Sequence, residues 1–108
     1  MNDEVEIYAE ALAIYGPTAQ IMMMLEEMAE LQIALLDRIR GRGDLDLCRR
    51  QIVEELADVS IMIGQMRHMF CSEAEFDRQK KLKIDRLGER IKARMAKLKA
   101  ETELLETR

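Results

Sequence analysis

The fold is decided by residues 17–40, which read PTAQIMMMLEEMAELQIALLDRIR. Up to Leu36 the only charged residues in this stretch are Glu26, Glu27 and Glu30. At helical spacing its apolar side chains cover far more than one face, and a helix of that kind is expected to be buried on nearly all sides. The stretch therefore predicts a core helix that carries three carboxylates.

The rest of the chain has the same helix-forming composition, with one proline, five glycines and abundant Ala, Leu, Glu, Lys and Arg. Breaks fall at Gly16-Pro17, at the glycine pair Gly41 and Gly43, and at Cys71-Ser72. We therefore predict an all-α, four-helix bundle with a long C-terminal helix. The helices are expected over residues 3–15, 17–40, 45–70 and 73–106.

The length of 108 residues corresponds to a single domain, 1–108, with its core over about residues 7–92 and a helical extension over 93–108. With 48% hydrophobic and 35% charged residues, the chain is expected to be soluble and globular, with no membrane partner. The acidic N-terminus does not resemble a secretory signal, so a cytoplasmic location is expected.

Charge and cysteine content exclude further classes. Residues 1–60 hold 13 acidic and 5 basic side chains, whereas residues 61–108 hold 8 acidic and 12 basic ones. This balance, with two Tyr, two Phe and no Trp, argues against a nucleic-acid partner. Two cysteines, Cys48 and Cys71, and one histidine, His68, cannot form a four-ligand zinc site or a disulfide framework.

Two acidic motifs repeat on consecutive predicted helices. Glu27 and Glu30 are three residues apart on one helix, and Glu55 and Asp58 are three residues apart on the next. At 100° per residue each pair points in nearly one direction, so two such helices packed antiparallel could bring four carboxylates together.

The alternative is that these acids form a solvated face, as most charged pairs do. Glu55, however, falls in the same angular arc as Val59, Met62 and Met66, with no Lys or Arg one turn away. A carboxylate inside an apolar stripe costs several kcal/mol unless it is paired or bound to a cation. The pattern therefore predicts a bound cation.

Carboxylate oxygens without His or Cys favour Mg²⁺, for which Mn²⁺ can substitute, and such sites usually bind phosphate oxygens as well. A di-iron centre would need a Glu-x-x-His pair on each of two helices, but Gln65 stands three residues before His68, the chain's one histidine. A phosphate-bearing substrate is therefore the expectation.

The motif Glu26-Glu27-x-x-Glu30, followed after 24 residues by Glu55-x-x-Asp58, resembles the MazG-like nucleotide pyrophosphohydrolases of the all-α NTP pyrophosphatase superfamily. The likeness is to the short, single-domain branch common in phages and bacteria, and it covers roughly residues 7–92. Its flanking matches are Tyr15-Gly16, Gln20, the segment 54–66 and Lys83-x-x-Arg86-Leu-x-x-Arg90-Ile.

The resemblance implies Mg²⁺-dependent hydrolysis of a nucleoside triphosphate between its α and β phosphates, giving the monophosphate and pyrophosphate. It also implies roles for individual residues. Those roles are activation of the attacking water for Glu26, metal ligation for Glu27, Glu30, Glu55 and Asp58, and substrate binding for Gln20, Lys83 and Arg86.

Apolar residues continue at steps of three, four and seven beyond Arg90, through Met95 and Leu98 to Leu105. This pattern predicts a helical seam that a partner covers, and the resemblance likewise implies a homo-dimer or homo-tetramer. Two other functions stay open: a non-catalytic helical module that binds nucleotides or mediates oligomeric interactions, and hydrolysis of a related substrate such as phosphoribosyl-ATP. The sequence does not identify the preferred base or sugar.

Overall fold

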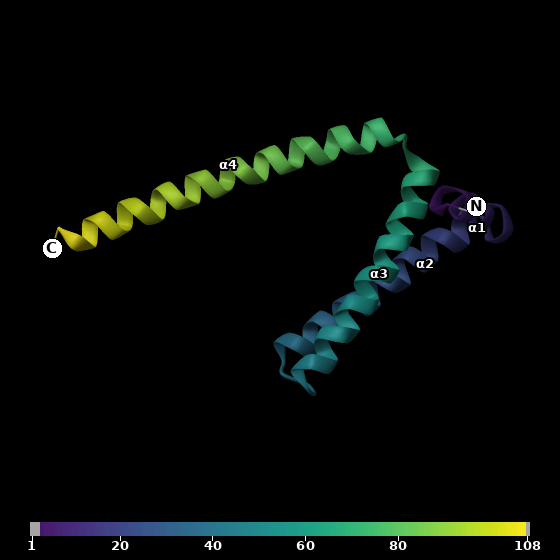
Figure 1. The fold of residues 1–108 in the computed structure, drawn as a ribbon, viewed down its shortest axis with the longest axis horizontal. Helices are drawn as coiled ribbons and strands as arrows, with labels where there is room; N and C mark the ends of the chain where they lie inside the picture. The colour runs from purple at the N-terminus through teal and green to yellow at the C-terminus, as the bar shows by residue number, and fades with distance from the viewer. Residues whose placement is uncertain (1–2, 108) are drawn as a thin grey trace. The chain divides into compact units, whose positions relative to one another are not determined.

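The computed structural model describes residues 3–107 and is all-α (Figure 1). Its helices are α1 (Glu4–Tyr15), α2 (Pro17–Ile39), α3 (Leu45–Phe70) and α4 (Glu73–Glu106). Each agrees with its predicted range to within one residue at either end. Among the described residues, no helix combines the length and the hydropathy needed to cross a membrane.

The chain divides into two compact units, one ending at Ser72 and the other beginning at Glu73. In the first unit α2 and α3 run antiparallel as a long hairpin, and α1 contacts both of them (Figure 1). The second unit is the single helix α4, which has 34 residues. The predicted count of four helices is therefore confirmed, with three of them packed together in one unit.

Local sequence signals explain where the helices begin. The Asp3 side chain caps α1 by accepting a hydrogen bond from the backbone N–H of Glu6 at 2.9 Å. Pro17 occupies the first turn of α2, where the N–H that proline lacks would have no partner within the helix. These two signals set the first two helices on either side of Gly16.

The turn between α2 and α3 depends on glycine and on Cys48. Gly41 and Gly43 have φ of 68° and 80°, a backbone conformation that favours glycine. Cys48 is 4% exposed, and its Sγ donates a hydrogen bond to the carbonyl oxygen of Arg42 at 3.0 Å. The two cysteines are free thiols, and Cys48 serves as a small buried side chain that fastens this turn.

α1 packs against α3 where α3 has no side chain. A Cβ placed on Gly64 would lie 2.5 Å from Cε2 of Tyr8 and 2.8 Å from its Cζ and hydroxyl oxygen. The ring therefore occupies the space that any other residue at position 64 would need. This contact joins residues that are 56 positions apart in the sequence.

The expectation that α2 is buried on nearly all sides is not met in this unit. Only Gln20 and Ala34 of α2 are buried, while Met22 and Leu25 are 56% and 59% exposed. On α3, Leu56 is 50% exposed. Three helices of this length cannot enclose so many apolar residues, because each helix has neighbours on only part of its circumference.

Candidate metal centre

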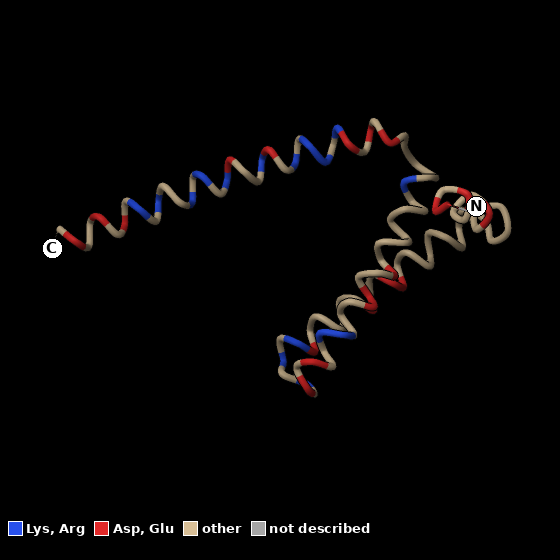
Figure 2. Tube along the Cα trace, in the orientation of Figure 1, with Lys and Arg blue, Asp and Glu red and all other residues tan. Residues whose placement is uncertain are grey.

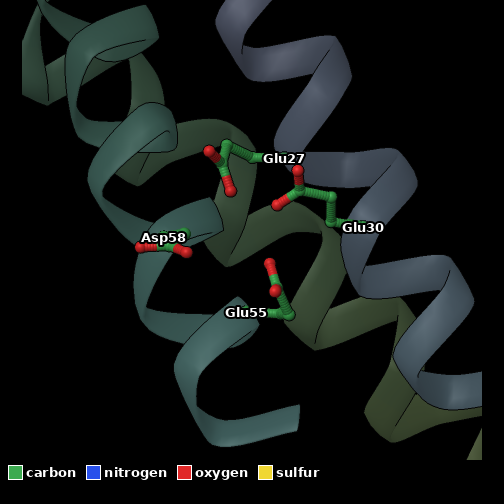
Figure 3. Close-up of side chains that lie close together, drawn as sticks. All are labelled: Glu27, Glu30, Glu55 and Asp58. Carbon is green, nitrogen blue, oxygen red and sulfur yellow. The ribbon is translucent and has the colours of Figure 1, made fainter. Parts of the chain in front are cut away.

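The α2–α3 hairpin brings the four predicted metal ligands together at the middle of its length. Glu27 and Glu30 come from α2, and Glu55 and Asp58 from α3, with their carboxylates converging between the two helices (Figure 3). One oxygen from each residue lies within 4.8 Å of the oxygens contributed by the other three. The antiparallel packing anticipated from the two i, i+3 pairs is therefore present.

Nothing cationic on α2 or α3 neutralises this cluster. On α3 the basic residues nearest in sequence are Arg50 and Arg67, and α2 has none before Arg38. The coloured positions at the middle of both helices are acidic (Figure 2). The ion pairs of Arg42 with Asp37 and of Asp46 with Arg49 and Arg50 lie near the turn instead.

Two of the four carboxylates have a buried oxygen without a partner. The Oε2 atoms of Glu27 and Glu55 are inaccessible to solvent and make no hydrogen bond in the part of the chain that is described. A buried acceptor that lacks a hydrogen bond is costly, and more so when it carries charge. Both oxygens are therefore positioned to accept a cation.

The electrostatics agree with this geometry. Partial burial raises the pKa of Glu27, and the carboxylates of Glu30, Asp58 and Glu55 raise it further. Partial burial, followed by the charges of Glu30 and Asp58, likewise raises the pKa of Glu55. Like charges at this spacing resist full ionisation unless a cation is bound among them. Four oxygen donors fit the preference of Mg²⁺ or Mn²⁺.

Glu26, the predicted water-activating residue, is exposed and lies one position before the first of these ligands, outside the four-residue cluster. Gln20, a predicted substrate contact, is buried on α2 with 5% exposure, and its Oε1 has no hydrogen-bond partner among the described residues. Gln20 is therefore a second unsatisfied polar group on the same helix, seven residues before Glu27.

Sequence reasoning missed Gln65 on α3, whose Oε1 is also buried and unpartnered within the described chain. The carboxylate cluster sets the hairpin register, with Glu27 level with Asp58. Counting seven residues outward from each reaches Gln20 and Gln65, about 10 Å along the helices. A search for polar residues two turns from the acids, on the same faces, would have found the pair.

Lys83 and Arg86 lie on α4, in the second unit, and the carboxylates lie in the first. Lys83 borders a groove of about 440 Å³ along one face of α4. The groove is lined by Phe76, Gln79, Lys80, Lys83, Ile84, Leu87 and Arg90. The cationic side chain of Lys83 therefore lies beside the apolar side chains that line this groove. Arg86 is exposed and is not among the groove's lining residues.

The chain matches no protein-family model, no curated protein and no solved structure.

Proposed function

We propose that the chain is a Mg²⁺-dependent nucleoside triphosphate pyrophosphohydrolase that converts a (d)NTP into the (d)NMP and pyrophosphate. The observation that carries this proposal is the convergence of four carboxylates, two of them with a buried, unpartnered oxygen, between α2 and α3. Hard oxygen donors of this kind suit a cation that binds phosphate. The motif resemblance given above supplies the reaction.

The roles follow from the residue types. Glu27, Glu30, Glu55 and Asp58 would hold the metal. When bound, Mg²⁺ supplies electrostatic stabilisation of the charge that develops on phosphate oxygens.

Glu26 accepts the proton from the water that attacks the α-phosphorus. The bond between the α-phosphorus and the α–β bridging oxygen breaks, and pyrophosphate leaves. Lys83 and Arg86 would pair with phosphate oxygens, because a triphosphate needs cationic groups in addition to the metal. Gln20 would contact the base or sugar. Gln65, which lies level with Gln20 in the hairpin, would make a contact of the same kind.

We also propose that the protein works as a homo-dimer or homo-tetramer. The outer faces of α2 and α3 expose large apolar side chains, among them Met22, Leu25, Val53 and Leu56, each at least half exposed. Large apolar patches on a protein surface mark interaction sites in soluble proteins.

The first experiment measures pyrophosphate release from a panel of (d)NTPs with Mg²⁺, with Mn²⁺ and with EDTA. We expect metal-dependent release with the matching monophosphate as co-product. Glu55→Gln and Asp58→Asn should abolish turnover while leaving the helical content unchanged. Glu54→Gln, which removes the same charge one position away, should keep it.

If the folded protein releases no pyrophosphate from any nucleotide of the panel, the result would favour the non-catalytic module instead. Phosphoribosyl-ATP in the panel tests the related substrate. Activity that survives Glu55→Gln and Asp58→Asn would overturn the assignment of the metal site.

A further inference from the structure

α4 is the longest helix of the chain, and none of its described residues is buried. Its 34 residues extend about 51 Å. An apolar row runs along the C-terminal part of this helix, over the 22 residues from Ile84 to Leu105.

This row comprises seven positions in which steps of four and three residues alternate, and we call it the α4 seam. Its members are Ile84, Gly88, Ile91, Met95, Leu98, Thr102 and Leu105.

The seam carries no charge, although ten of the 22 residues from Ile84 to Leu105 are charged. Its large apolar side chains are exposed, from 44% for Leu98 to 68% for Leu105. An average step of 3.5 residues is the repeat by which two helices coil around each other. The seam is therefore built to face another helix that has the same repeat.

We propose that the α4 seam pairs with the α4 seam of a second copy of this chain, with the two helices antiparallel. A second copy supplies a helix with the same repeat, and its Lys99 offers a charge partner for Asp85. The proposal does not rest on the proposed hydrolysis, because no seam residue belongs to the candidate metal centre or to its substrate contacts.

Side-chain size favours the antiparallel direction. With Ile91 beside Met95 of the second copy at the centre, Gly88 lies opposite Leu98 and Ile84 lies opposite Thr102. The Gly88–Leu98 and Ile84–Thr102 layers each combine a larger with a smaller residue, which is how a well-filled core is built. Leu105 lies beyond these layers, opposite Lys81 of the second copy. A parallel pair would place Gly88 opposite Gly88 and leave a void.

Charges beside the seam favour the same direction. In the antiparallel pair Asp85 lies beside Lys99 of the second copy, once towards each end of the pair. In a parallel pair Arg94 would lie beside Lys99, and Glu101 beside Glu106, so both contacts would repel. Residues that flank a helix pair in this way set its orientation.

The antiparallel pair has two contacts between like charges, at its centre, where Lys92 and Arg94 each meet their own counterpart. Lys92 Nζ lies 3.6 Å from Glu89 Oε1 of its own helix, which offsets part of that charge.

The test compares two double variants of the full chain by sedimentation velocity. Ile91→Glu with Leu98→Glu places two charges in the seam. Ala93→Glu with Ala100→Glu places the same charges on the opposite face of α4. We expect the seam variant to have half the mass of the wild type, with a dissociation constant raised by at least ~100-fold, because two charges would be buried without partners.

The opposite-face variant should keep the wild-type mass. Equal helical circular dichroism for both variants keeps the comparison valid, because α4 is exposed and its helix does not depend on these side chains. A monomeric wild type, or a seam variant with the wild-type mass, would overturn the proposal.

Lys99→Glu tests the direction of pairing. It places a carboxylate beside Asp85 in an antiparallel pair, so the dimer should dissociate more readily, and Asp85→Lys in the same chain should restore it. In a parallel pair the same substitution would meet Arg94 and tighten the dimer, a result that would contradict the antiparallel arrangement.

Discussion

Gly64→Ala should destabilise the protein even though alanine is the better helix former. The new Cβ would lie 2.5 to 2.8 Å from the ring and hydroxyl of Tyr8, where ordinary contacts begin at 3.4 Å. Overpacking of this kind costs about 1–3 kcal/mol. The intrinsic preference of a helix for Ala over Gly returns about 0.5–1 kcal/mol. The net loss in the free energy of unfolding should be about 0–2.5 kcal/mol, with a midpoint of about 1 kcal/mol.

Urea denaturation of four proteins isolates the Tyr8 contact: the wild type, the two single variants Gly64→Ala and Tyr8→Ala, and the double variant. In the Tyr8→Ala background the ring is gone, so Gly64→Ala should stabilise the protein by about 0.5–1 kcal/mol. The sign of the effect therefore reverses between backgrounds. Equal destabilisation in both backgrounds, or a stabilised single variant, would refute the close approach of α1 to α3.

Three further predictions concern charge, capping and the turn. Folding raises the pKa of Glu27 and Glu55, so the folded metal-free protein binds more protons than the unfolded chain. Its Tm should therefore fall as the pH rises from 4.5 towards 7. Glu55→Gln removes one of these carboxylates and should make the fall in Tm smaller. Added Mg²⁺ should raise the Tm at pH 7 more than at pH 5, and a Tm independent of both pH and Mg²⁺ would argue against the cluster. Asp3→Ala should cost about 1 kcal/mol and speed amide exchange in the first turn of α1, whereas Asp3→Asn should not. Cys48→Ala should cost about 1 kcal/mol by chemical denaturation, with Cys48→Ser losing less because it keeps a donor for the turn.

Much of this structure follows from local signals in the sequence. Pro17 and the glycines at 41 and 43 set helix ends that the structure reproduces, because proline and positive φ act within a few residues. The carboxylate cluster was also predictable, since the spacing of Glu27 from Glu30 fixes their directions on one helix. Only the antiparallel pairing of two helices had to be added.

Features that depend on distant residues were not predictable in the same way. The contact of Tyr8 with Gly64 needs the docking angle of α1, which no local pattern encodes. The buried, unpartnered Oε1 of Gln20 was also not predicted, because the surroundings of this atom are known only when α3 is placed beside α2. The apolar coverage of α2 was overestimated, because periodicity gives the faces of a helix but not the number of its neighbours.

The two roles proposed for α4 can coexist because they use different faces of one helix. Arg86 lies about 160° around the axis from Ile84, and Lys83 about 100° from it. Pairing along the α4 seam would therefore leave both cations free to meet phosphate. The seam variant separates the two roles: if it is monomeric yet hydrolyses (d)NTPs at the wild-type rate, the pairing is architectural. If activity falls with protein concentration in step with dissociation, the second copy is needed for the site to work.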